Sequence, residues 1–201
     1  EFPEARPEGD ERKPTVAFDV IIGNPPYGDL LSPSEEVVTD TYRMASKDIV
    51  ALFLERQLSL LADDGYIGNV ASLKITYDDS LAELLDIFRE RLDTAQISCF
   101  GKRPSCVFEG VEVRIAVLSG QKNDVEYEDE PPENIETSEF LRFDDDIDRD
   151  ERLRNVTHRS VEGYILRDNG IGEDGDYVKL PKMGSERIEG IIQTLKEQGR
   201  E

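Results

Sequence analysis

The fold follows from one stretch of the sequence, Phe18-Asp19-Val20-Ile21-Ile22-Gly23-Asn24-Pro25-Pro26-Tyr27. Val20 to Ile22 are apolar and β-branched, which is typical of a strand covered on both faces of a parallel sheet. Open α/β sheets bind ligands beyond the carboxyl ends of their strands, and Asn24 to Tyr27 follow this strand directly. The two prolines remove two N–H donors, so the carbonyl groups of the turn face outward. The stretch therefore predicts an α/β sheet with a ligand-binding turn at its edge.

The side chains of this turn are suited to holding a planar amine. Asn24 Oδ1 and the Pro25 carbonyl can together accept both hydrogens of an exocyclic amino group, while Tyr27 stacks on the ring that carries it. Two such hydrogen bonds draw the nitrogen out of conjugation and make it more nucleophilic in the transition state. The pattern favours methylation of an aromatic amine without a general base. The alternative is a Pro-Pro turn that merely closes a strand.

Strands and amphipathic helices alternate along the next hundred residues. Apolar spacing predicts a first helix over about residues 47–63, with Phe53 on its buried stripe and Gly65 as its stop. A capping box of Ser80 and Glu83 predicts the start of a second helix. Strands are expected at residues 66–70, 95–100 and 111–117, the last two forming a hairpin. The order strand, helix, strand, helix, strand, strand is that of half a doubly wound α/β domain.

Three segments in this order resemble the N6-adenine DNA methyltransferases of type II restriction-modification systems. Asn24 to Tyr27 looks like motif IV of that family. Residues 48–68 are similar to its following helix and strand, and residues 100–111 resemble its motif VIII loop and hairpin. A short stretch, Leu180 to Ser185, is similar to the element that introduces the target-recognition region in many members. The resemblance implies a Rossmann-like fold that uses S-adenosylmethionine to methylate adenine in DNA.

The resemblance also implies roles for particular residues. Asn24, Pro25 and Tyr27 match the catalytic motif, and Phe108 matches the aromatic that stacks on the other face of the flipped adenine. For Phe108 the alternative is a core position in the hairpin. Pro26 and Phe53 match family positions that line the cofactor's adenine pocket. Lys102 and Arg103 flank the loop that would face the nucleic acid, so we expect them to contact phosphate, with a solvated hairpin tip as an equal alternative.

The resemblance and the residue patterns together divide the chain into three parts. Residues 1–17 read as a polar lead-in without the glycine-rich cofactor turn, so the first half of the domain is expected from a missing N-terminal half or a partner subunit. Residues 18–120 are expected to form the methyltransferase domain from motif IV onward. Residues 121–201 read as an acidic linker and the start of a target-recognition region, an α+β extension with strands at 140–143 and 161–166 and a helix at 185–198.

The composition raises one objection to DNA binding and argues against several other classes of protein. A formal net charge of −21 opposes binding to a polyanion. The spread of Asp and Glu along the chain is that of a halophilic protein, and at about 1 M salt the Debye length is only about 3 Å. No signal peptide or long apolar stretch occurs, which predicts a cytoplasmic protein with reduced cysteines. His158 is the only histidine; we expect it at the surface, and no metal site.

Two other functional classes remain open. Methyltransferases that act on ribosomal RNA or on protein glutamine also use Asn-Pro-Pro-Tyr, so the substrate could be RNA or a protein amide. The expected absence of the cofactor half instead favours an inactive remnant or a split-subunit interaction module.

Overall fold

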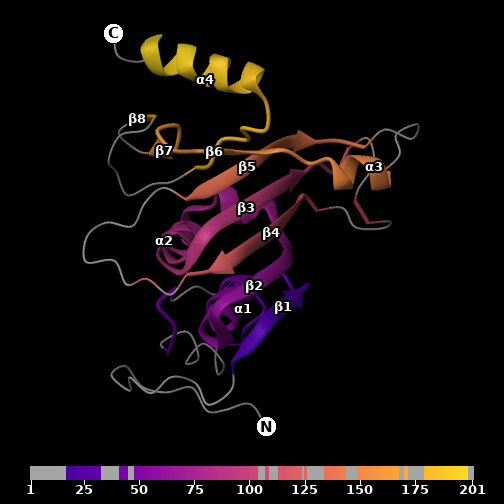
Figure 1. Ribbon diagram of the computed structural model, residues 1–201, viewed down its shortest axis with the longest axis vertical. Helices are drawn as coiled ribbons and strands as arrows, with labels where there is room; N and C mark the ends of the chain where they lie inside the picture. Colours follow the sequence, from indigo (N-terminus) through magenta and orange to yellow (C-terminus); the bar gives the residue numbers. More distant parts are fainter. Residues whose placement is uncertain are drawn as a thin grey trace.

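A six-stranded mixed sheet forms the centre of the chain (Figure 1). The computed structural model describes residues 17–32, 41–44, 48–103, 107–108, 113–123, 125, 134–143, 149–167, 170–171 and 179–198. The sheet strands are β1 (Phe18–Gly23), β2 (Leu61–Ser72), β3 (Leu92–Phe100), β4 (Ile115–Lys122), β5 (Ile135–Leu141) and β6 (His158–Ser160). The helices are α1 (Ile49–Leu60), α2 (Ala82–Arg91), α3 (Arg149–Arg154) and α4 (Glu186–Gln198), with short 3₁₀ turns η2 (Leu73–Thr76) and η3 (Asp79–Leu81) and a small ribbon of β7 (Leu166–Arg167) and β8 (Gly170–Ile171).

The strand order in the sheet is β1-β2-β4-β3-β5-β6. β1 pairs with β2 and β3 pairs with β5 in parallel, while β4 lies antiparallel between β2 and β3. The predicted element order and the β3–β4 hairpin are therefore confirmed. The strand expected at 111–117 begins only at Ile115 and runs to Lys122, because β4 is a central strand that has a partner on each side.

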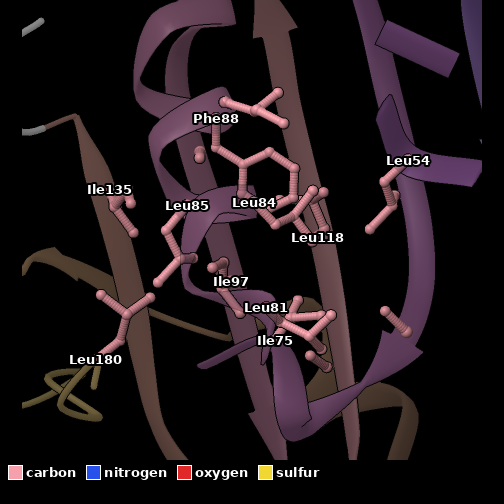
Figure 2. Close-up of a cluster of buried hydrophobic side chains, with 14 of the residues drawn as sticks. Leu54, Ile75, Leu81, Leu84, Leu85, Phe88, Ile97, Leu118, Ile135 and Leu180 are labelled. Atoms are coloured by element: carbon pink, nitrogen blue, oxygen red, sulfur yellow. The ribbon is translucent and has the colours of Figure 1, made fainter. Parts of the chain in front are cut away.

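Helices α1 and α2 cover one face of the sheet. Both belong to crossovers between parallel strands that step in the same direction, so the usual right-handed connection places them on the same side. Their apolar stripes close a single core with the facing sheet residues. In Figure 2, Phe88 and Leu84 of α2 point toward Leu118 and Ile97 of the sheet, and all four are fully buried. Burial of side chains of this size contributes about 1.5–3 kcal/mol each.

The opposite face of the sheet is open at the β1 edge. Val20 and Ile22 are 56% and 82% exposed, so the expectation of a strand covered on both faces is wrong for this chain. Together with Tyr66 of β2 they line a shallow hollow of about 510 Å³. Within the described residues, β1 pairs with β2 along one side and has no partner strand along the other. An apolar edge strand of this kind is unusual, because such edges pair readily with other chains.

The ends of α1 differ from those predicted. Asp48 is the N-cap, and the helix stops at Leu60, three residues earlier than expected. Asp64, which has a positive φ of 62°, lies in β2 where its pairing with β1 is irregular, between the Phe18–Leu61 and Val20–Tyr66 pairs. Gly65 belongs to β2 and is needed for close packing, since a Cβ there would lie 2.9 Å from the Ala62 carbonyl oxygen.

The predicted capping box at the second helix is also wrong. Asp78 accepts a hydrogen bond from the Ser80 N–H and caps η3, a 3₁₀ turn that precedes α2. Glu83 instead forms an ion pair with Arg43. A local motif was overridden here by a tertiary contact between the 41–44 turn and α2.

The C-terminal part of the chain joins the same sheet. β5 begins at Ile135, inside the stretch whose composition is that of a linker, and β6 lies at 158–160 rather than 161–166. Residues 180–184 then cross back over the core, where Leu180 and Met183 are buried. The final helix, predicted at 185–198, is α4 and is confirmed. No helix of the described ranges has both the length and the apolar character needed to span a bilayer.

Candidate active site

The carboxyl ends of β1, β2, β3 and β5 lie at one edge of the sheet because these four strands run in the same direction (Figure 1). The Asn24–Tyr27 turn follows β1 at this edge, and the Lys102 loop follows β3. Two strands separate β1 from β3, which corresponds to roughly 14 Å across the sheet. The two segments singled out by the sequence thus share an edge, with the ends of β2 and β4 between them.

The turn after β1 exposes an amide and tucks an aromatic ring against the core. Asn24 and Pro26 are exposed, Pro25 is buried, and Tyr27 is half-buried against the main hydrophobic cluster. The Tyr27 hydroxyl donates a hydrogen bond of 2.6 Å to Asn24 Oδ1. Burial raises the pKa of Tyr27 above its ordinary value of 10.0, so the hydroxyl stays protonated and remains a donor at neutral pH.

Residues behind the turn hold it at both ends. Gly23 pairs with Asn69 of β2, and the Asn69 amide donates a 2.7 Å hydrogen bond to Gln57 of α1. Beyond the turn, the Gly28 N–H donates to the Asp48 carboxylate over 3.1 Å. Sequence reasoning missed the roles of Gly23, Asn69 and Gln57. The available signal was the glycine directly before Asn24, since a strand glycine often marks a close approach.

Phe53 lies on α1 but is not part of its buried stripe. Its side chain is 43% exposed, whereas Leu52 and Leu54 on either side are buried, so the expectation of a buried Phe53 is wrong. The helix uses Val50, Leu54 and Leu58 to contact the sheet, which leaves Phe53 at the border of that stripe. An aromatic side chain at this border is accessible to a ligand.

The loop after β3 carries the other predicted substrate contacts. Lys102 and Arg103 are exposed, and Phe108 is 42% exposed, so the alternative of a core position for Phe108 is not realised. Val107 beside it packs on the small cluster of Phe100 and its neighbours. The structure brings Asn24 and Tyr27 into contact and places Phe108 at the same sheet edge.

His158 is not the surface residue that the sequence suggested. It is half-buried on β6, where its Nε2 lies 2.9 Å from the Ser98 hydroxyl. Burial lowers the pKa of His158 below 6.5, and the negative charge of Glu136 opposes that shift. The ring ties β6 to β3 across β5 and lies away from the Asn24–Tyr27 turn in sequence and in sheet position.

Comparison with known proteins connects this architecture to one family. The family model described as Eco57I restriction-modification methylase matches residues 1–108, more than half of the chain. The protein RM.MjaORFECS2P of Methanocaldococcus jannaschii, named as a type II restriction enzyme and methyltransferase, is 47% identical over 51 residues. The type II restriction enzyme and methyltransferase RM.Eco57I of Escherichia coli is 32% identical over 92 residues. These segments cover 25% and 42% of this chain but only 4% and 9% of the two relatives.

Solved structures share the fold at low sequence identity. The chain is similar to a structure described as the modification subunit of a type I restriction enzyme from Vibrio vulnificus YJ016, with a TM-score of 0.58 and 16% identity. It is also similar to the M protein of the type I restriction enzyme EcoKI, with a TM-score of 0.51 and 11% identity. The matches cover 86% and 91% of this chain and 40% and 49% of those chains. The matched part of the chain thus spans less than half the length of each of these four proteins.

Proposed function

The chain belongs to the Eco57I restriction-modification methylase family, and from this premise we propose that it carries the catalytic turn of an adenine-specific DNA methyltransferase. The proposed reaction moves the methyl group of S-adenosylmethionine to N6 of an adenine that has been flipped out of the duplex. Asn24, Pro25 and Tyr27 orient the amine, Phe108 and the cations of its loop contact the DNA, and Pro26 and Phe53 contact the cofactor.

The observation that carries this proposal is the exposed amide of Asn24, held by the Tyr27 hydroxyl. An amide oxygen has two lone pairs, so Asn24 Oδ1 can accept one hydrogen bond from Tyr27 and a second from the adenine amino group. The Tyr27 bond fixes which atom of the amide faces the substrate. A preorganised acceptor of this kind lowers the barrier because it does not have to reorient as charge develops on the amine.

Two aromatic side chains support the binding of an extruded base. Tyr27 and Phe108 both lie at the carboxyl edge of the sheet, where Phe108 is exposed and Tyr27 is half-buried. Stacking on an aromatic side chain contributes about 1–3 kcal/mol per base, which is comparable with the cost of unstacking one. Salt screens ion pairs with phosphate but acts less on stacking, so stacking would suit a chain with a net charge of −21 in the concentrated salt that its composition predicts.

The residues present fit one side of a cofactor site. Phe53 offers an accessible ring and Pro26 an exposed apolar surface, both suited to contact with the adenine of S-adenosylmethionine. When bound, the cofactor would supply the methyl group. The chain's own contribution is to hold the cofactor's adenine beside the turn and to keep Asn24 aligned.

The uncovered apolar face at β1 supports a further polypeptide segment in the working enzyme. Burying Val20 and Ile22 would remove two strongly exposed apolar side chains from water, at about 25 cal/mol per Å². We propose that the rest of the methyltransferase sheet, from the same polypeptide or a partner subunit, pairs with β1 and covers this face. The glycine-rich cofactor turn would arrive with it.

Methyl transfer by an Asn24→Ala variant tests the proposal. The chain, joined with the polypeptide that completes the sheet, is given labelled S-adenosylmethionine and DNA, RNA or protein in concentrated potassium chloride. We expect N6-methyladenine in digests of the DNA and a loss of about 100-fold or more for Asn24→Ala. Asn155→Ala, which removes an exposed amide far from the turn in sequence, is the matched control and keeps the wild-type rate. Methylation of RNA or protein, or full activity of Asn24→Ala, contradicts the proposal.

The open β1 face also favours a second candidate, a split-subunit interaction module that has no activity of its own. The rate of the Asn24→Ala variant in the completed enzyme separates the two readings, because a pure interaction module would leave methyl transfer unchanged. Calorimetric titration of the 201-residue chain with S-adenosylmethionine tests whether the cofactor site is self-contained. Absence of binding by a folded chain supports a subunit that depends on its partner for the cofactor. Saturable binding shows a self-contained cofactor site and excludes the module.

A further inference from the structure

A carboxylate fastens the main chain after the Asn24–Tyr27 turn to the start of α1. Asp48 Oδ1 accepts one hydrogen bond from the Val50 N–H of its own helix (3.2 Å) and another from the Gly28 N–H (3.1 Å). In return, the Gly28 carbonyl accepts a 3.1 Å hydrogen bond from the Ile49 N–H. The turn and the helix N-terminus therefore cap each other, and Asp29 and Asp48 form an antiparallel bridge beside them.

An ordinary N-cap would satisfy only the N–H groups of its own helix. Asp48 does this and also holds an N–H that lies 20 residues earlier in the sequence, directly after Tyr27. Gly28 can present its N–H in this direction because its φ is +95°, a left-handed conformation that glycine adopts at little cost. The arrangement thus depends on a glycine and a carboxylate together.

We propose that Asp48 is a positioning residue that sets the placement of Asn24 and Tyr27 through Gly28. The catalytic part of this inference rests on the proposed function. The start of the turn is already held by the pairing of Gly23 with Asn69 and by the hydrogen bond between the side-chain amides of Asn69 and Gln57. Asp48 holds the end of the turn, so both ends of the turn are anchored to the same helix, α1.

The proposal predicts a specific kinetic signature. Asp48 reaches the turn through Gly28, so its loss displaces Asn24 relative to the base without removing a substrate contact. A misplacement of about 1 Å can lower a rate by about 100-fold. We therefore expect the Asp48→Ala variant to lose about tenfold or more in kcat, with the KM for DNA changed by less than about threefold.

Two variants and one control make the test. Asp48→Asn retains an oxygen that can accept both hydrogen bonds, so it is expected to keep at least about one third of the wild-type kcat. Asp78→Ala removes another aspartate N-cap, that of η3, whose carboxylate accepts its hydrogen bonds from Ser80 within the described part of the chain. It loses a cap of the same chemistry and should leave kcat unchanged. Kinetics are measured on the completed methyltransferase, and amide hydrogen exchange of Gly28 and Ile49 on the 201-residue chain.

The exchange measurement keeps this proposal separate from the proposed function. Asp48→Ala should speed the exchange of the Gly28 amide by about tenfold or more, while Asp48→Asn and Asp78→Ala leave it protected. If the wild-type enzyme transfers no methyl group to DNA, the proposed function fails, and unchanged Gly28 exchange in Asp48→Ala would still overturn the anchoring role. If the enzyme is active, full kcat for Asp48→Ala, or equal losses for Asp48→Asn and Asp48→Ala, overturns the positioning role.

Discussion

The hydroxyl group of Tyr27 lies 2.6 Å from Oδ1 of Asn24 and donates a hydrogen bond to it. The two residues that the sequence assigns to separate tasks, stacking and amine orientation, are therefore coupled before any substrate arrives. Burial keeps the pKa of Tyr27 above its ordinary value, which maintains this donor across neutral pH. Tyr27 thus has a polar role in addition to the apolar role of its ring.

Substituting Tyr27 separates these two roles. Tyr27→Phe keeps the ring and removes the hydrogen bond, so we expect methyl transfer to fall by roughly threefold to tenfold, the equivalent of about 0.5–1.5 kcal/mol. Tyr27→Ala also removes stacking worth about 1–3 kcal/mol per base and should lose considerably more. Single-turnover rates with DNA measure both changes. Equal losses for Phe and Ala would show that the hydroxyl, rather than the ring, carries the function.

Gly23→Ala should destabilise the chain by about 1–3 kcal/mol, because the new Cβ would lie 2.7 Å from Asn69 Oδ1 and 3.1 Å from Gln57 Nε2. The amide pair would have to move, and the start of the catalytic turn with it. Denaturant unfolding in concentrated salt gives the free energy of unfolding.

Gly190→Ala is the matched control for this substitution. A Cβ at Gly190 meets nothing within 4 Å among the described residues, and the residue lies inside α4. Alanine there should stabilise the chain by about 0.5–1 kcal/mol. A Gly23→Ala variant as stable as the wild type would show that the amide pair yields without cost.

His158 should titrate below pH 6.5. Burial lowers its pKa although Glu136 acts in the opposite direction. The unfolded chain therefore takes up the proton first as the pH falls, and the contribution of His158 to the free energy of unfolding declines below about pH 6.5. NMR of the ring protons reads this directly, since the chain has one histidine. A midpoint at or above 6.5 would mean that Glu136 outweighs burial.

Cys99 should make the chain less stable in alkali. Its thiol is fully buried, and burial raises its pKa from 9.0 to about 11, although Lys182 nearby lowers it in part. The unfolded thiol ionises first, so its contribution is present below about pH 9 and is lost as the pH rises toward 11. The difference in unfolding free energy between wild type and Cys99→Ala should shrink by about 1 kcal/mol at pH 10. A difference that is constant between pH 8 and 10 would contradict this.

Local pattern predicted the order of elements in this chain and failed where tertiary contacts decide. The helix that contains Phe88 was found from apolar spacing, because that spacing directly reflects the buried face. Its capping interaction was predicted wrongly, since Glu83 forms an ion pair with Arg43 from a distant turn rather than a hydrogen bond to the backbone of Ser80. Arg43 and Glu83 lie 40 residues apart in the sequence, so no short local motif contains both of them.

For the site, the sequence predicted the residues but not the contacts that hold them. Asn24 and Tyr27 were identified because their residue types carry the chemistry. Their mutual hydrogen bond, the support by Asn69 and the reach of Asp48 to Gly28 depend on strand register and on one left-handed glycine. The exposure of Ile22 was missed for another reason: apolar residues indicate that a surface tends to be covered, but they do not indicate what covers it.

Residues 180–184 also affect how the domain is made. Lys182 donates to Thr76 Oγ1 across 106 residues of sequence, and the backbone N–H of Leu180 donates to the Thr76 carbonyl. Contacts of such high sequence separation slow folding, because the loop must close before they contribute. On the ribosome, roughly 40 residues separate the end of β5 from this segment, a delay of about two to eight seconds at about 5–20 residues per second. During that interval the apolar surface that Leu180 and Met183 later cover stays exposed on the nascent sheet, where chaperones can bind it.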